Sequence, residues 1–279
     1  MRVRVVTDST CDVPEELLAK HNIRMLPAYI HFGLESLKDD GVSITKEELY
    51  RRLRSSNTIP TTAAFPPGEA EVVYEELLQE ADHIISFHLS STLSGIFSSA
   101  LVASKAVAPE KITVVDTGLV SMAAGWIAIM AAEMAEQGRE LSTILEEVDS
   151  AKQRSTLWAS PETLEFLRRS GRINWVIAGM GTLLQIKPLV MVKGGAVTQD
   201  GRVRTFKNAL KELVAKARQE APLERLAILH LDNAELAISM QEELADIAPP
   251  HTVTVCASSA IATHFGPGGL GVATLRKKP

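Results

Sequence analysis

Two short stretches of the chain combine hydroxyl, imidazole and glycine groups that could together bind an acidic ligand. Residues 90–95 (Ser-Ser-Thr-Leu-Ser-Gly) follow an apolar run and precede a predicted helix. The first N–H groups of a helix are unpaired and its dipole is positive there, so this position attracts anions. His264 belongs to the second stretch, residues 263–268 (Thr-His-Phe-Gly-Pro-Gly), which we predict to be a surface loop. Hydroxyls and an imidazole beside a helix N-terminus suit a carboxylate.

The same residues allow two other interpretations. In a serine hydrolase, Ser94 would be the nucleophile and His264 the base, oriented by Asp8 or Asp116. Ser94 lacks the preceding glycine of a GxSxG elbow, but a triad is defined by geometry, so the alternative stays open. A regulatory module that binds phosphate or a small acid could use the same helix N-terminus.

The composition favours a globular protein with an aliphatic interior. Apolar residues make up 46% of the 279 residues and aromatic residues only 5%, so branched aliphatic side chains should line any internal pocket. The formal net charge of −5 disfavours nucleic acid as a partner and allows at most transient contact with a membrane.

Neither a metal site nor a cofactor site is expected. Cys11 and Cys256 stand far apart with no metal-binding spacing around them. Residues 266–271 fit a GxGxxG pattern, but the helix and acidic residue that a dinucleotide site requires do not follow. The start of the chain resembles a strand and not a signal peptide, and no apolar run is long enough to span a bilayer. We therefore expect a cytoplasmic protein.

Strand-like and helix-like segments alternate along the first half, which predicts an α/β fold with a mainly parallel sheet. Asp12 is predicted to cap the first helix and Thr45 the second. The second half is predicted to be a mixed α/β domain containing an antiparallel hairpin, with Asp200-Gly201 as its turn. We place the domain boundary between residues 158 and 159, which gives an N-terminal domain of residues 1–158 and a C-terminal domain of residues 159–279.

Four blocks of sequence together resemble the DegV family, which includes the fatty-acid-binding subunits of bacterial fatty acid kinase. The blocks occur in the family's order and span essentially the whole chain. They are residues 6–12 (Val-Thr-Asp-Ser-Thr-Cys-Asp), 91–95 (Ser-Thr-Leu-Ser-Gly), 169–173 (Arg-Ser-Gly-Arg-Ile) and 264–268 (His-Phe-Gly-Pro-Gly).

The resemblance implies a two-domain α/β fold with a fatty acid buried between the domains. It implies that Thr62, Ser94 and His264 bind the carboxylate, with Thr61 and Gly95 next to them. A separate ATP-dependent kinase subunit then phosphorylates that carboxylate to an acyl phosphate, so the chain itself would be a lipid-binding protein without catalytic residues. The family's Ser-Gln-Pro after the threonine is replaced here by residues 63–65 (Ala-Ala-Phe).

The chemistry of a fatty acid is consistent with this expectation. Burial contributes roughly 0.8 kcal/mol per CH₂, or about 11 kcal/mol for a sixteen-carbon chain before ordering costs. Hydrogen bonds to the charged head group contribute about 1.5–3 kcal/mol each. The tail therefore dominates affinity, and the polar residues mainly orient the head group.

The family resemblance also predicts a basic surface on which the kinase docks near the carboxylate. Arg172, Arg202 and Arg204 are the candidates, because the planar guanidinium group pairs well with carboxylates at interfaces. Arg172 could instead cap carbonyl groups at the end of a helix predicted over residues 161–169.

Overall fold

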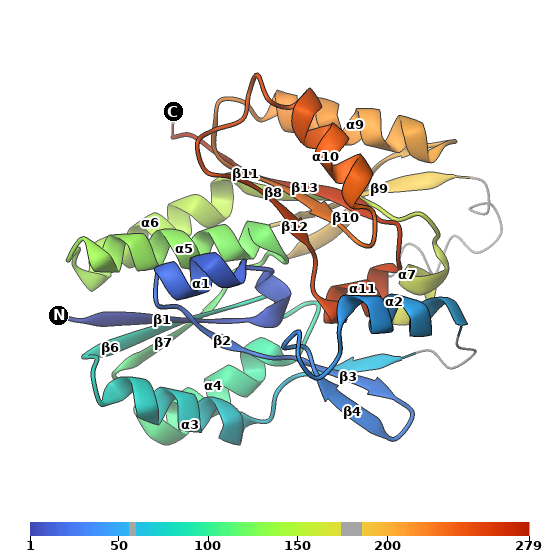
Figure 1. The fold of residues 1–279 in the computed structure, drawn as a ribbon. Coiled ribbons are helices and arrows are strands. Elements are labelled where there is room, and N and C mark those ends of the chain that lie inside the picture. Colours follow the sequence, from blue (N-terminus) through green and yellow to red (C-terminus); the bar gives the residue numbers. More distant parts are fainter. Residues whose placement is uncertain (56–59, 174–185, 279) are drawn as a thin grey trace.

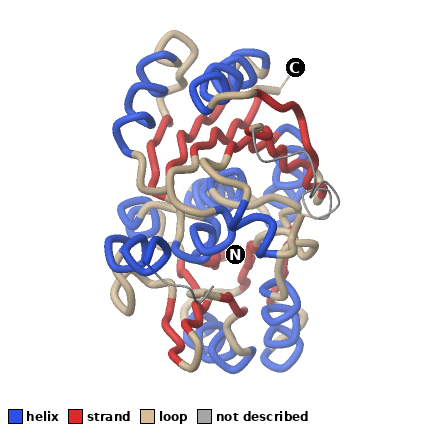
Figure 2. Tube along the Cα trace, turned by 90° about the vertical axis from the view of Figure 1, so that its right-hand side faces the viewer, coloured by secondary structure: helices blue, strands red, loops and turns tan. Residues whose placement is uncertain are grey.

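The computed structural model describes residues 1–55, 60–173 and 186–278, which form an α/β fold of stacked sheets and helices. A parallel sheet lies in the lower half of Figure 1 and a mixed sheet in the upper half, with helices between and outside them. The same layers are visible from the side in Figure 2. The fold class predicted from the sequence, with a parallel sheet in the N-terminal part and a mixed sheet in the C-terminal part, is confirmed.

The parallel sheet has four strands whose carboxyl ends all meet at one edge. Their order is β2 (Arg24–Leu26), β1 (Val3–Asp8), β6 (His83–His88) and β7 (Ile112–Asp116). All six residues of β6 are buried, as expected for a strand covered on both faces of the sheet. Helices α3 (Pro67–Leu78) and α4 (Ile96–Val107) cover one face.

Helix α5 (Met122–Glu136) lies between the two large sheets and contacts both of them. Residues 122–132 are all buried, which explains why this segment is apolar on every side. A Cβ atom at Gly125 would lie 2.5 Å from the carbonyl oxygen of Cys11, so glycine allows α5 to approach the 3₁₀ turn at Ser9–Cys11. Helices α1 (Glu15–Lys20) and α6 (Leu141–Arg154) complete this layer.

The mixed sheet has six strands, of which only β11 and β12 are parallel neighbours. Its order is β10 (Ala196–Val203), β9 (Lys187–Lys193), β8 (Ser155–Ser160), β13 (Leu270–Arg276), β11 (Leu223–His230) and β12 (Thr252–Cys256). Helices α9 (Phe206–Gln219) and α10 (Ala234–Glu243) cover the face that points away from α5.

A third, three-stranded sheet brings the N-terminal part of the chain against its C-terminal part. Its order is β4 (Glu35–Lys38), β3 (Tyr29–Phe32) and β5 (Thr61–Ala63). Helices α2 (Lys46–Ser55), α7 (Glu165–Ser170) and α11 (Ser259–Phe265) lie around it. A shared core joins Ile30 and Leu49 to Leu231 and Ala262, so segments some 200 positions apart pack together.

Three local predictions were wrong. Asp12 has φ +55° and does not cap α1, whose N-cap is Pro14; its carboxylate instead accepts a hydrogen bond from the N–H of Ser258. The hairpin turns at Gly194-Gly195, where both residues have positive φ, whereas Asp200-Gly201 lies at an irregularity within β10. His264 stands in the last turn of α11 and not in a loop.

The predicted division at residue 158 falls within β8, a strand of the mixed sheet, and stays a prediction. Among the described residues, no helix is both long enough and apolar enough to cross a lipid bilayer.

Candidate functional site

Thr62 and His264 form the polar centre of the site. Thr62 is the middle residue of β5 and pairs with Ile30 of β3, which fixes its backbone. His264 extends from the C-terminal turn of α11, a helix whose N-cap is Ser258. The two side chains meet with Thr62 Oγ1 at 2.6 Å from His264 Nε2. Both predicted residues are therefore brought together in one hydrogen-bonded pair.

The imidazole of His264 is neutral at physiological pH. Burial, and to a smaller extent the nearby positive charge of Arg172, lower the pKa of His264 to about 4. A neutral imidazole has one N–H donor and one acceptor nitrogen. Since one polar hydrogen is used between Thr62 and His264, the pair keeps one N–H or O–H that can donate to a carboxylate, and it carries no charge of its own.

Ser94 stands at the end of the loop between β6 and α4. Its Oγ accepts a hydrogen bond from the N–H of Ile96 at 3.3 Å, although the N-cap position of α4 is Gly95. Ser94 therefore lies one residue before the N-cap of α4, close to the start of a helix as the sequence predicted. Its side chain and those of Thr62 and His264 line the same cavity.

This cavity lies between the mixed sheet and the loops that follow β1, β6 and β7. It contains about 1080 Å³ of unoccupied space, a volume that includes open solvent at its mouth. Aliphatic side chains from both halves of the chain dominate its wall. They include Leu93, Ile96, Leu157, Val190, Val192 and Leu229.

Several polar residues that the sequence did not assign also line the cavity. They are Thr10, Ser121, Ser170 and His230. Burial lowers the pKa of His230, which favours a neutral imidazole there as well. Thr10 and Ser170 belong to the blocks at residues 6–12 and 169–173, which are the sequence signals that could have indicated them. The aliphatic wall residues carry no such signal, because buried strands anywhere in the fold have the same composition.

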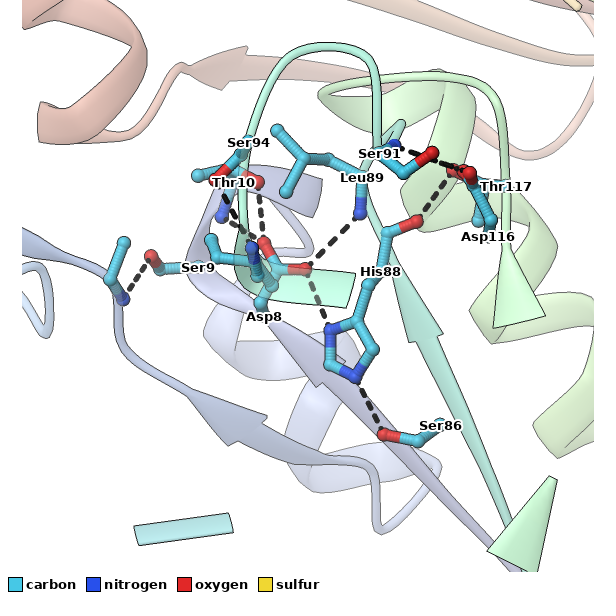
Figure 3. Close-up of polar contacts among 12 residues, drawn as sticks. Asp8, Ser9, Thr10, Ser86, His88, Leu89, Ser91, Ser94, Asp116 and Thr117 are labelled. Atoms are coloured by element: carbon cyan, nitrogen blue, oxygen red, sulfur yellow. Dashed lines mark hydrogen bonds and ion pairs between the residues drawn. The ribbon is translucent and has the colours of Figure 1, made fainter. Parts of the chain in front are cut away.

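Asp8 organises the loops beside Ser94 (Figure 3). One carboxylate oxygen accepts from the N–H and the hydroxyl of Thr10, at 2.9 and 2.5 Å. The other lies 3.0 Å from Nδ1 of His88, whose Nε2 is 2.8 Å from the hydroxyl of Ser86. Asp8, Ser86 and His88 are buried and do not line the cavity, so this chain of contacts supports the fold of the loops.

The geometry disfavours a serine hydrolase. Nε2 of His264 is paired with Thr62, and Asp8 is bonded to Thr10 and His88. Asp116 accepts from the N–H groups of Ser91 and Gly118. Within the described part of the chain, neither carboxylate contacts His264, and no hydrogen bond joins Ser94 to it. The apolar wall also disfavours the third alternative, a site for phosphate or a small acid.

The remaining predicted residues lie around the site in different ways. Arg172 is exposed, yet it lines the cavity, and its Nη1 donates to the carbonyl of Ser170 at 2.6 Å at the end of α7. Arg202 and Arg204, at the end of β10, are exposed and stand outside the cavity wall. Thr61 and Gly95 are also exposed and do not line the cavity.

No cluster of three or more His, Cys, Asp or Glu side chains that could hold a metal ion occurs in residues 1–55, 60–173 and 186–278. The site offers hydroxyls, imidazoles and one guanidinium group around an apolar space. Chemically, such polar groups can contact an acidic head group while the apolar wall contacts a hydrocarbon tail.

The structure is a three-sheet α/β fold with an apolar-walled cavity, and comparison with known proteins identifies its family. Residues 2–277 match the family described as "Uncharacterised protein, DegV family". The chain belongs to the DegV family.

Curated relatives match over nearly the whole chain. A DegV domain-containing protein of Streptomyces coelicolor is 35% identical, and the match covers 97% of each chain. The DegV domain-containing protein of Deinococcus radiodurans is 33% identical and the DegV protein of Bacillus subtilis 31% identical, with 98% of each chain covered.

Solved structures share the fold. A DegV family protein from Thermus thermophilus, described as fatty acid binding, superposes with a TM-score of 0.92 at 32% identity, covering 99% of this chain and all of the other. The DegV protein of Bacillus subtilis, described as a fatty acid binding protein, gives a TM-score of 0.88 at 32% identity over the same shares. Fatty acid binding is thus a property of DegV family proteins similar to this one.

Proposed function

We propose that this protein binds one long-chain fatty acid in the cavity and presents its carboxylate to a separate kinase. The observation that carries the proposal is the apolar-walled cavity that has the Thr62–His264 pair and Ser94 on its wall. The similar DegV proteins described as fatty acid binding support the ligand class.

In this proposal the head group and the tail have different tasks. The tail lies among the aliphatic side chains, where burial supplies most of the free energy of binding. The carboxylate accepts one hydrogen bond from Ser94 and one from the Thr62–His264 pair, whose other polar hydrogen stays in the bond between the two side chains. These hydrogen bonds satisfy a charge that would otherwise be costly to bury. Thr61 and Gly95, next to these residues, are exposed and outside the cavity wall, so they do not contact the head group in this proposal.

The proposed partner is an ATP-dependent kinase subunit in the cytoplasm, where ATP is available. A carboxylate oxygen of the bound fatty acid attacks the γ-phosphorus of ATP, ADP leaves, and an acyl phosphate remains. The present chain supplies no catalytic group in this scheme; it orients the nucleophile and excludes water from the tail. Arg172, Arg202 and Arg204 form the proposed docking surface for the kinase.

The test of the ligand is direct. We expect organic extraction of the purified protein, followed by mass spectrometry, to yield close to one free fatty acid per chain. Recovery of none, together with no binding of added palmitate or oleate by calorimetry, would contradict the proposal. Formation of acyl phosphate with ATP and the kinase subunit tests the second part separately.

A further inference from the structure

Helix α11, which carries His264, is too short to hold its own position. It has seven residues, Ser259–Phe265, and helices of this length are not stable in isolation. Its position must therefore come from groups outside it. Ala260, Ile261 and His264 all line the cavity, so any shift of the helix moves the imidazole within the site.

Two carboxylates from the N-terminal part of the chain hold the start of this helix. Asp39, which directly follows β4, accepts from the N–H of Ser259 at 2.9 Å with Oδ1 and from the N–H of Ala260 at 3.2 Å with Oδ2. Asp12 accepts from the N–H of Ser258 at 2.7 Å. Each of these N–H groups lacks a partner within the helix, and a carboxylate at this end also interacts favourably with the helix dipole.

The carboxylate of Asp39 is itself fixed. Asp39 is only 5% exposed, and its Oδ2 accepts a further hydrogen bond from Ser9 Oγ at 3.0 Å. Ser9 Oγ in turn accepts from the N–H of Ala28 at 3.1 Å. The chain of contacts therefore runs from the segment before β3, through Ser9 and Asp39, into α11.

We propose that Asp39 is a positioning residue that sets the place of His264 in the site by holding the N-terminus of α11. The inference deepens the proposed function, because it concerns a residue that contacts the fatty acid carboxylate there. Asp39 does not touch the ligand in this scheme and acts only through the helix.

The main variant is Asp39→Asn. An asparagine offers one acceptor oxygen and places an NH₂ group where the second acceptor was, so the N–H of either Ser259 or Ala260 loses its partner. We expect α11 to shift and His264 to become more accessible to water. Since burial is the main cause of its low pKa, the pKa of His264 should rise from about 4 toward 6.5.

The measurement is an NMR titration of the histidine side chains in the ligand-free protein, with His264→Gln to assign the resonance. The control is Thr205→Ala, because Thr205 caps α9 by accepting from the N–H of Asn208 at 3.2 Å, and it does not line the cavity. We expect this control to lower the melting temperature without moving the pKa of His264. An equal pKa shift in both variants would show general destabilisation and overturn the proposal.

Ser9→Ala provides a milder test if Asp39→Asn does not fold. It keeps both carboxylate oxygens of Asp39 and removes only the hydroxyl that orients them, so we expect a smaller pKa rise in the same direction. A folded Asp39→Asn or Ser9→Ala protein in which His264 titrates as in the wild type contradicts the positioning role.

Fatty acid affinity is a second measurement, independent of the histidine titration. Where fatty acid binding is measured, Asp39→Asn should weaken it by about tenfold, the effect of misplacing one head-group contact. If no fatty acid binds to the wild type, the proposed function fails, but the titration of the ligand-free variants still decides the role of Asp39.

Discussion

Thr62 Oγ1 and His264 Nε2 lie 2.6 Å apart although 202 positions separate the two residues in the chain. Strand β5 supplies one and helix α11 the other, and the three-stranded sheet brings these elements together. Because the low pKa of His264 keeps the ring neutral, the pair presents one free donor without a formal charge. The head-group contacts can therefore be altered one at a time without adding or removing a charge.

Replacing Thr62 by valine removes the hydroxyl and keeps the shape of the side chain. We expect fatty acid affinity to fall by about ten- to a hundredfold, because a hydrogen bond to a charged group contributes about 1.5–3 kcal/mol. Much of the affinity should remain, since the tail is unchanged. Calorimetry with palmitate measures the effect, and Thr61→Val, an exposed neighbour on the same strand, is the control. Equal losses in the two variants would remove Thr62 from the head-group site.

The tail is tested on strand β10, where Val197 lines the cavity and Val203 does not. We expect Val197→Phe to place its ring in the space of the acyl chain and to reduce the amount of fatty acid that copurifies. Val203→Phe adds the same volume outside the cavity and should leave that amount unchanged. Mass spectrometry of extracted lipid compares the two, and full lipid occupancy in Val197→Phe would argue against a tail in this cavity.

The pKa of His264 has a consequence for stability. The folded value of about 4 is below the unfolded value of about 6.5, so the unfolded chain binds more protons in this window. Neutral His264 makes its full contribution to the free energy of unfolding above pH 6.5. This contribution, up to about 3 kcal/mol, is lost as the pH falls toward 4. We expect His264→Gln, which cannot be protonated, to show a weaker loss of stability between pH 6.5 and 4 than the wild type. Urea unfolding at several pH values measures this, and parallel curves for the two proteins would contradict it.

The sequence predicted the α/β class and most strands and helices, because hydrophobic periodicity is a local signal. It also singled out Thr62, Ser94 and His264, which line the same cavity; their contact with a head group stays a prediction. It did not predict the partners of Asp12 or Asp39, because those hydrogen bonds depend on packing between segments more than 200 positions apart. The prediction that His264 lies in a loop was wrong for the same reason: the contacts that hold α11 come from distant segments. The glycines and proline after it are visible in the sequence, whereas the carboxylates that hold α11 lie far away.

Ser94→Ala separates ligand binding from hydrolysis. Since Ser94 is one of several donors and the tail supplies most of the affinity, we expect the variant to keep most of its fatty acid binding. Neither the wild type nor the variant should hydrolyse p-nitrophenyl esters above background. Turnover by the wild type that disappears in Ser94→Ala would instead identify Ser94 as a nucleophile.

The proposed docking surface is tested with Arg172 and Arg204. We expect Arg204→Ala to leave fatty acid binding nearly unchanged and to slow acyl-phosphate formation by the kinase subunit, because an exposed guanidinium group acts mainly through a partner. Arg172→Ala should do the same and also raise the pKa of His264, because the charge of Arg172 helps to keep that pKa low.

Arg24→Ala is a matched control, since Arg24 is exposed and its Nη2 lies 2.9 Å from Glu76 on the parallel-sheet side of the molecule. We expect this control to be phosphorylated at the wild-type rate. Wild-type rates for Arg172→Ala and Arg204→Ala would place the docking surface elsewhere. If Arg172→Ala loses thermal stability and lipid binding together, its main role is the contact with the carbonyl of Ser170 at the end of α7. The kinase would then recognise this protein without Arg172.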